Sequence, residues 1–164
     1  MKHFKITNLM LSLLPDLLGV LTLDDKKSCA RRRFFRNLNP HIEDFKQARA
    51  DLQEKYGKKD GSGNFVTDKQ GVIQYTPENK VLINKSWAEL NDTVVTIDVL
   101  PSNEPDMLTM KQIILDEQKR FIEEKKNEFT HMDYDYSATL EEIAQAITLI
   151  DPNATDVAVD EAKE

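Results

Sequence analysis

Six basic side chains and no acidic one lie between positions 26 and 36 of the chain. They are Lys26, Lys27, Arg31, Arg32, Arg33 and Arg36. Cations at this density can neutralise nucleic-acid phosphates or bind the acidic groups of a protein. On a helix they would spread around the circumference, and the neighbouring aromatic Phe34 belongs to the core stripe, which removes a base-stacking surface. We expect partner binding here. A solvated face, a dock for acidic groups that include the chain's own C-terminus, a partner protein and nucleic acid all stay open, with nucleic acid the least supported.

Catalytic groups have little support in the sequence. Cys29 is the single cysteine, and a catalytic thiol would need a positioned base that the sequence does not show. His3 and His41 are isolated from any nucleophile, and the chain has no phosphate-binding glycine loop, zinc-ligand spacing or nucleophile elbow. We therefore expect no enzyme and no cofactor.

Two acidic stretches invite a metal-binding interpretation. Asp60 to Asp68 alternates oxygen-bearing side chains, but Phe65 stands where a calcium loop needs glycine, so a plain turn is the better prediction. His131, Asp133 and Asp135 would share one face if extended, yet three ligands without a second cluster favour a solvated acidic loop. We expect no metal site.

The composition indicates one intracellular globular domain. The chain has 164 residues, 40% of them hydrophobic and 31% charged, with a formal net charge of −7. Residues 133–164 carry nine acidic side chains against Lys163, so the acidity belongs to the C-terminal fifth. The apolar run from Leu9 to Leu21 is interrupted by Pro15 and Asp16, which favours a buried helix over a signal peptide or a membrane span.

A long helical arm from 22 to 57 must position the basic residues. After a short strand at 3–6, Thr7 or Asn8 can cap a helix that runs to about Leu21, kinked or started late because of Pro15. The arm then begins after Thr22 or Asp24, with a core stripe of Ala30, Phe34 and Leu38. Pro40 predicts either a kink in the arm or a fresh helix start.

Turns, a shorter helix and a strand follow the arm. Gly57 stops the helix, and residues 65–67 and 72–75 flank a turn as in a β-hairpin. Thr76 and Pro77 start a helix whose apolar stripe is Ile83, Trp87 and Leu90. The β-branched run at 93–100 predicts a strand that pairs with the N-terminal one.

Two further helices are expected before an acidic tail. Residues 107–129 form two apolar ridges, so this helix could contact two neighbours or a second copy of the chain. The closing helix is predicted at 140–150, with a capping box at Thr139 and Glu142. We predict a single α+β domain at 1–152, in which 102–136 is an insertion, and a disordered acidic tail at 153–164.

Several helix ends and turns resemble those of a known family. The segments FKQARADLQEKYGKKDG at 45–61 and WAELNDTVVTID at 87–98, with a glycine-containing hairpin between them, are similar to small uncharacterised proteins of tailed phages and prophages of Gram-positive bacteria. FKITN at 4–8 and LEEI at 140–143 are similar to that family's first strand and last helix. Residues 102–136 have no counterpart, and Pro40 departs from the pattern. The resemblance implies phage origin and no defined activity.

These observations predict a mostly helical α+β protein, in which a long helical arm packs on a small antiparallel sheet beside a β-hairpin. The leading hypothesis is a non-enzymatic phage protein that acts through protein contacts, in tail or head assembly or as an accessory factor, in the host-cell cytoplasm or the virion. Its partners would be other phage proteins or a host protein, with self-association through 107–129 as a further option. The alternatives are an inhibitor of a host defence enzyme that uses the acidic C-terminus, and a nucleic-acid-binding protein that uses the basic helix.

Overall fold

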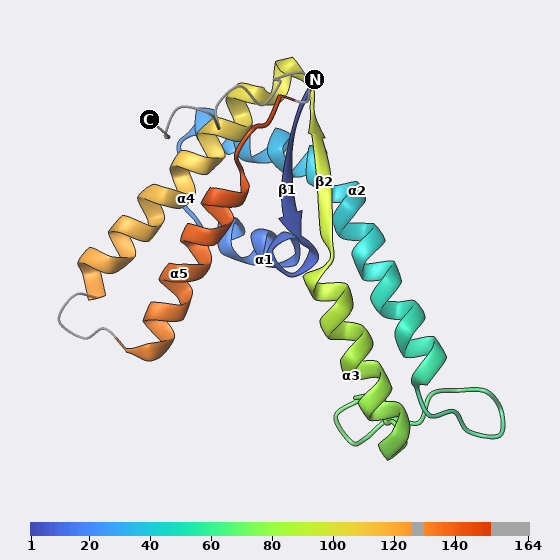
Figure 1. Cartoon of the computed structure of the whole chain (residues 1–164). Helices are drawn as coiled ribbons and strands as arrows, with labels where there is room; N and C mark the ends of the chain where they lie inside the picture. Colours follow the sequence, from blue (N-terminus) through green and yellow to red (C-terminus); the bar gives the residue numbers. More distant parts are fainter. Residues whose placement is uncertain (126–129, 152–164) are drawn as a thin grey trace, which may run out of the picture.

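Two helical pairs diverge from a two-stranded antiparallel sheet in the computed structural model, which describes residues 1–125 and 130–151 (Figure 1). One pair is α2 with α3, the other is α4 with α5, and α1 lies between them beneath the sheet. The elements are β1 (Lys2–Thr7), α1 (Asn8–Gly19), α2 (Asp25–Tyr56), α3 (Pro77–Asp92), β2 (Val94–Val99), the short 3-10 helix η1 (Pro101–Asn103), α4 (Glu104–Lys125) and α5 (His131–Ala146).

The sheet joins distant parts of the chain. β1 pairs with β2 in the register Phe4 opposite Ile97, which confirms the predicted strand pairing. Alternate side chains point to one face, and there Phe4, Ile6, Ile97 and Val99 are at most 2% exposed. These side chains form one side of the hydrophobic core.

The C-terminal end of the described chain completes the sheet. The N–H of His3 donates to the carbonyl of Ile150 at 3.0 Å, and the N–H of Ile150 donates back to His3 at 2.7 Å. On the opposite edge, Nδ2 of Asn37 donates to the Asp98 carbonyl at 3.1 Å. The sheet is thus flanked by the C-terminal segment on one edge and by α2 on the other.

The first helix starts where the sequence predicts and contains its proline. Thr7 caps α1 by accepting the N–H of Met10 at 3.3 Å. Because α1 already begins at Asn8, the alternative of a late start near Ser12 is wrong, and Pro15 lies inside the helix. Its leucines at 11, 14 and 18 are buried, which fixes α1 against the core.

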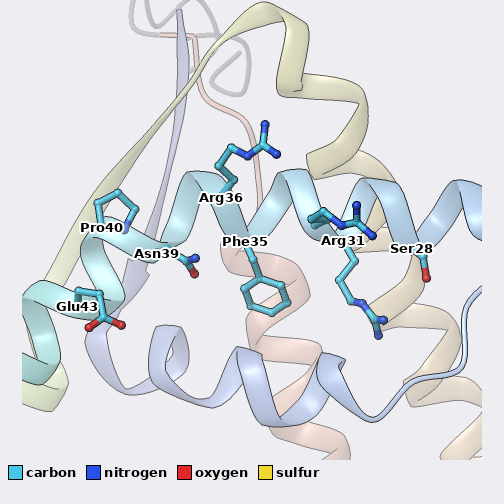
Figure 2. A pocket seen from close by; sticks show the side chains of 8 residues that line it. Ser28, Arg31, Phe35, Arg36, Asn39, Pro40 and Glu43 are labelled. Atoms are coloured by element: carbon cyan, nitrogen blue, oxygen red, sulfur yellow. The ribbon is translucent and has the colours of Figure 1, made fainter.

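The arm is one continuous helix of 32 residues. Asp24 caps it by accepting the N–H of Lys27 at 2.8 Å, and Gly57 follows its last residue. Pro40 does not start a fresh helix, so that alternative is wrong. A proline cannot donate to the carbonyl four residues back and its ring crowds that turn. Figure 1 shows that α2 changes direction along its length, and Figure 2 places Pro40 at this change.

The predicted β-hairpin after α2 is only partly formed. The described residues between α2 and α3 contain two single bridges, Lys59 with Phe65 and Thr67 with Ile73, in place of two strands. The turns themselves are as predicted, and Gly63 and Gly71 have φ values of 85° and 81° that favour glycine. Backbone hydrogen bonds join the two turns: the N–H of Lys58 donates to Gln74, that of Gln74 to Val66 and that of Val66 to Lys58, each at 2.8 Å.

α3 begins as the sequence indicates. Thr76 caps it through the N–H of Asn79 at 3.2 Å, and Pro77 occupies the first turn. Ile83 of the predicted stripe is fully buried, whereas Trp87 and Leu90 are half-buried because only α2, α1 and the loop cover this helix.

The last two helices begin earlier than the sequence indicates. α4 starts at Glu104, where η1 leads directly into it, and its Met107, Met110 and Ile114 are fully buried. α5 starts at His131, so the predicted start at Thr139 is wrong.

The N-cap of α5 is Thr130, with its capping-box partner Asp133 three residues later. The buried stripe of α5 is as predicted through Ile147, but Ile150 is 46% exposed and pairs with β1. The last helix therefore begins before the predicted range of 140–150 and also ends before the end of that range.

The core forms where these elements meet, and the fold class is confirmed. The chain is mostly helical with a small two-stranded antiparallel sheet, among the residues that are described. Within 1–125 and 130–151 no helix is long and apolar enough to cross a membrane. Phe129 and the acidic segment 153–164 lie outside the described residues, and the extent of the domain and of an insertion at 102–136 stays a prediction.

Candidate protein-interaction surface

The rotation of α2 about its axis decides the role of each basic residue. Its core stripe of Ala30, Phe34 and Leu38 is at most 3% exposed. At about 100° per residue, Arg31 and Arg33 fall on opposite flanks of that stripe, while Arg32 and Arg36 point away from the core. The six cations therefore do not form one surface.

Arg31 binds the end of α1. Its Nη1 donates to the carbonyl of Leu18 at 2.6 Å and to that of Leu21 at 2.9 Å. Carbonyls at a helix C-terminus lack intrahelical donors and carry the negative end of the helix dipole. A guanidinium there donates hydrogen bonds to these carbonyls and its positive charge interacts favourably with the dipole. This arginine ties α1 to α2.

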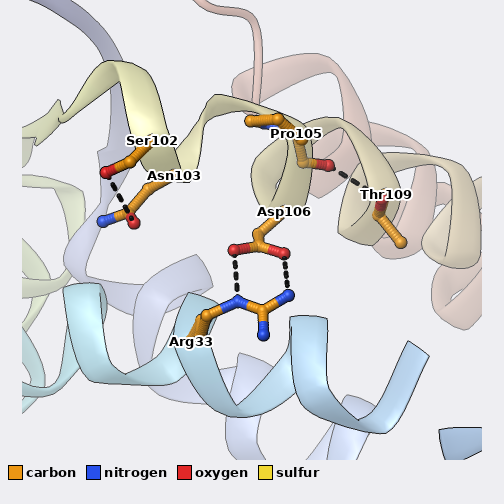
Figure 3. A network of polar contacts seen from close by, with 6 residues as sticks. All are labelled: Arg33, Ser102, Asn103, Pro105, Asp106 and Thr109. Carbon is orange, nitrogen blue, oxygen red and sulfur yellow. Dashed lines mark hydrogen bonds and ion pairs between the residues drawn. The ribbon is translucent and has the colours of Figure 1, made fainter. Parts of the chain in front are cut away.

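Arg33 binds the first turn of α4. Its Nε and Nη2 donate to the two carboxylate oxygens of Asp106, both at 2.7 Å (Figure 3). Asp106 is 7% exposed, whereas the side chain of Arg33 is 48% exposed. The carboxylate raises the pKa of Arg33, first through the hydrogen bonds and then through its charge. This fork fixes α2 against α4.

Arg32 and Arg36 are exposed and make no hydrogen bond or ion pair with the part of the chain that the structure describes. They are four residues apart, so they lie on the same face of α2. Lys26 and Lys27 are exposed in the first turn, and Lys27 lies 3.9 Å from its neighbour Asp24. We call the pair Arg32 and Arg36 the basic strip.

An open groove of about 700 Å³ runs beside the basic strip (Figure 2). Its lining combines cations, an aromatic ring and polar groups: Ser28, Arg31, Arg32, Phe35, Arg36, Asn39, Pro40 and Glu43. In Figure 2 the ring of Phe35 points toward α1 and the Arg36 side chain points away from it.

The groove can bind an extended acidic segment. Phe35 supplies an apolar surface, and the guanidinium groups supply several N–H donors with a geometry that fits carboxylates. Because Pro40 has no N–H, the carbonyl of Arg36 has no donor four residues ahead. Glu43 adds one negative charge at the far end, where Nζ of Lys46 donates to it at 2.8 Å.

A second groove has no excess of either charge. It has a volume of about 520 Å³ and lies between the segment 20–23 and α4. Its cations are Lys27 and Arg120, and its acids are Asp116 and Glu117. Arg120 donates to both oxygens of Glu117, at 2.9 and 2.6 Å, and these bonds raise the pKa of Arg120. This groove favours no ligand class.

The other candidate groups stay separate. His131 lies 3.5 Å from Asp135 within one helix, and the described residues contain no group of three or more metal-binding side chains. Asp60 accepts the N–H groups of Ser62 and Asn64, and these backbone hydrogen bonds, with that of Asn64 the larger, lower its pKa. The carboxylate of Asp60 thus holds the turn together.

The outer ridge of α4, proposed for self-association, is only partly apolar. Leu108 is 55% exposed and Ile122 is 40% exposed, but Leu115 is half-buried against the core. Gln112 and Lys119 occupy the helical positions between them. The ridge therefore offers two isolated apolar side chains.

Sequence reasoning missed the partners that divide the basic residues. Asp106 is 73 positions from Arg33, and the Leu18 carbonyl is backbone, so neither leaves a local pattern. It also missed the groove beside the basic strip. A signal was present, since Phe35 and Asn39 recur at a spacing of four beside the core stripe.

Comparisons with protein-family models, curated proteins and solved structures gave no match to this chain.

Proposed function

We propose that this chain is a non-enzymatic protein of phage origin that binds an acidic segment of another protein with the groove beside Arg32 and Arg36. The observation that carries the proposal is that the arginines of α2 differ in their contacts. Arg31 and Arg33 are engaged inside the protein, while two neighbouring arginines face solvent beside an apolar ring. The phage origin rests on the resemblance of the helix ends and turns, and it would place the protein in the host-cell cytoplasm or the virion.

A protein partner is favoured over nucleic acid by the number of cations available on one face. Nucleic-acid affinity grows with the number of phosphates neutralised, and the salt slope is about 0.9 per phosphate. Two convergent arginines beside an acidic Glu43 would give a slope near two and weak binding. A carboxylate-bearing segment of 2–3 acidic residues matches the groove better.

The test compares two double variants that change the net charge equally. Arg32→Glu/Arg36→Glu reverses the basic strip. Lys58→Glu/Lys69→Glu reverses two exposed lysines of the loop after α2, and it is the matched control.

Each tagged variant is expressed while the encoding phage or prophage replicates, and bound proteins are identified by mass spectrometry. We expect the wild type and the control to retain the same protein partner and the strip variant to lose it. Nuclease-sensitive material in place of a protein would favour nucleic-acid binding. Equal capture by all three variants would reject the basic strip as the binding surface.

The assembly role is tested by the identity of the partner. A tail or head protein would support virion assembly, and the purified virion would then contain the chain. A host enzyme would favour the alternative of a defence inhibitor, and truncation after Ile150 would show whether the acidic C-terminus takes part.

A further inference from the structure

We infer that residues 152–164 of the same chain bind the basic strip and its groove, and so compete with the partner. The competition, though not the contact itself, rests on the proposed function.

The described chain ends close to α2. Ile150 hydrogen-bonds His3 on one edge of the sheet, His3 faces Asp98 across the strands, and Asp98 accepts from Asn37 of α2 on the other edge. Neighbouring strands are about 5 Å apart, so Ile150 and Asp98 are about 10 Å apart across the sheet, and α2 lies beyond Asp98. Arg36 directly precedes Asn37.

The remaining chain is long enough to extend past the sheet to α2. Fourteen residues follow Ile150 in the sequence. An extended chain covers about 3.3 Å per residue, which gives a reach of about 46 Å. The reach exceeds the width of the sheet about fourfold, so it permits a curved path.

The charges are complementary. Residues 152–164 contain four acidic side chains and one basic one, a formal net of −3. Two cations lie nearer the end of the described chain. Nζ of Lys2 donates to the Glu104 carboxylate at 2.8 Å, which pairs its charge, whereas Nζ of Lys111 donates to the uncharged hydroxyl of Thr148 at 3.1 Å. Lys5 is exposed on the open face of the sheet and provides a single charge on the way.

A weak contact is sufficient because it is intramolecular. A short tether gives an effective concentration of about 1 mM, so a site with a dissociation constant of about 1 mM would be half occupied. Half occupancy doubles the apparent dissociation constant of any partner that needs the same site. The expected effect on partner binding is therefore at least twofold.

The single cysteine provides a direct measurement. Cys29 is exposed on α2, three residues before Arg32 and seven before Arg36, so it lies on the same side of the helix. A nitroxide on Cys29 will broaden the amide NMR signals of nearby residues. We expect broadening of the signals of 153–164 in the full-length chain at about 50 mM salt, and its loss at about 0.5 M salt.

The charge-reversal variants show whether the basic strip causes the broadening of these NMR signals. Arg32→Glu/Arg36→Glu should restore the signals of 153–164, whereas the control Lys58→Glu/Lys69→Glu should leave them broadened. Signals that are never broadened, or broadening that persists in the strip variant, would overturn the inference. Circular dichroism of each variant shows whether it is folded.

Competition is measured with fluorescent hexaglutamate as the probe, so it does not depend on finding the partner. The tail variant neutralises four acids: Asp156→Asn, Asp160→Asn, Glu161→Gln and Glu164→Gln. It should bind the probe at least twofold more tightly than the wild type, and an unchanged affinity would reject competition. If the NMR contact is present but no partner capture depends on the strip, the proposed function fails while the intramolecular contact stands.

Discussion

Separate replacement of Phe34 and Phe35 by alanine tests the rotation of α2, on which the position of the basic strip depends. The two neighbours have the same side chain, and their rings touch edge to face at 5.7 Å, so both variants lose that contact. Phe34 is 0% exposed, whereas Phe35 is half-buried at the groove. Phe34→Ala should cost about 4 kcal/mol, because it leaves a cavity in the core. Phe35→Ala should cost about 1 kcal/mol, because it removes only partial burial.

The assay is urea and thermal unfolding followed by circular dichroism. For a chain of this size 1 kcal/mol corresponds to about 2–4 °C in Tm, so we expect a fall of about 8–16 °C for Phe34→Ala and about 2–4 °C for Phe35→Ala. A rotation of α2 by one residue, about 100°, would exchange the two costs and turn Arg32 and Arg36 toward the flanks. Costs that agree within about 1 kcal/mol, or a larger cost for Phe35, would refute the orientation described above.

Three further predictions concern other parts of the fold. Gly57→Ala should lower stability by about 1–3 kcal/mol in urea unfolding, because a Cβ there would lie 2.7 Å from Cε1 of Phe65; an unchanged urea midpoint would contradict the close approach. Hydrogen bonds to Asp133 in its capping box lower its pKa from the ordinary value of 3.8. The stabilisation that Asp133 contributes is therefore fully present above pH 3.8 and is lost as the pH falls through the pKa of the folded protein. Asp133→Asn should therefore be less stable than the wild type at neutral pH, and the gap between their urea midpoints should close in acid. Arg49→Ala should change the emission of Trp87, the single tryptophan, because the guanidinium carbon lies 5.5 Å from its ring; identical spectra would show that the stacking is absent in solution.

The sequence was most reliable where the apolar periodicity and the capping residue indicate the same helix start. Both strands were found from their alternating or β-branched residues. The cap of α3 at Thr76 was found because a polar cap precedes an apolar stripe, and the same pattern limited the caps of α1 and α2 to two candidates each, of which the structure has Thr7 and Asp24. The start of α5 was missed because two threonines are each followed by an acid three residues later. Tyr136, four residues before the buried Leu140, continues the stripe toward Thr130 and could have decided between them.

The candidate site was less predictable because its character depends on contacts between distant residues. Local sequence identifies a basic segment but not which cations are engaged. Arg33 is taken by a carboxylate on α4, and Arg31 by carbonyls of α1. Pro40 allowed two outcomes, and the continuous stripe from Leu38 to Ile42, both buried, favours the unbroken helix. The hairpin prediction overestimated the strands, because β-branched residues extend a ladder only where another strand pairs with them.

The closure of the sheet by Ile150 has a consequence for synthesis on the ribosome. β1 is made before its partner β2, which is more than 80 residues later, and the residue that pairs with its other edge is later still. Contacts of such long range slow folding, because the loop between them must be closed before they form. The nascent chain can form α1 and α2 early, but the strand that precedes them waits until Ile150 has been made. We expect the native core to assemble only after this residue has left the ribosome.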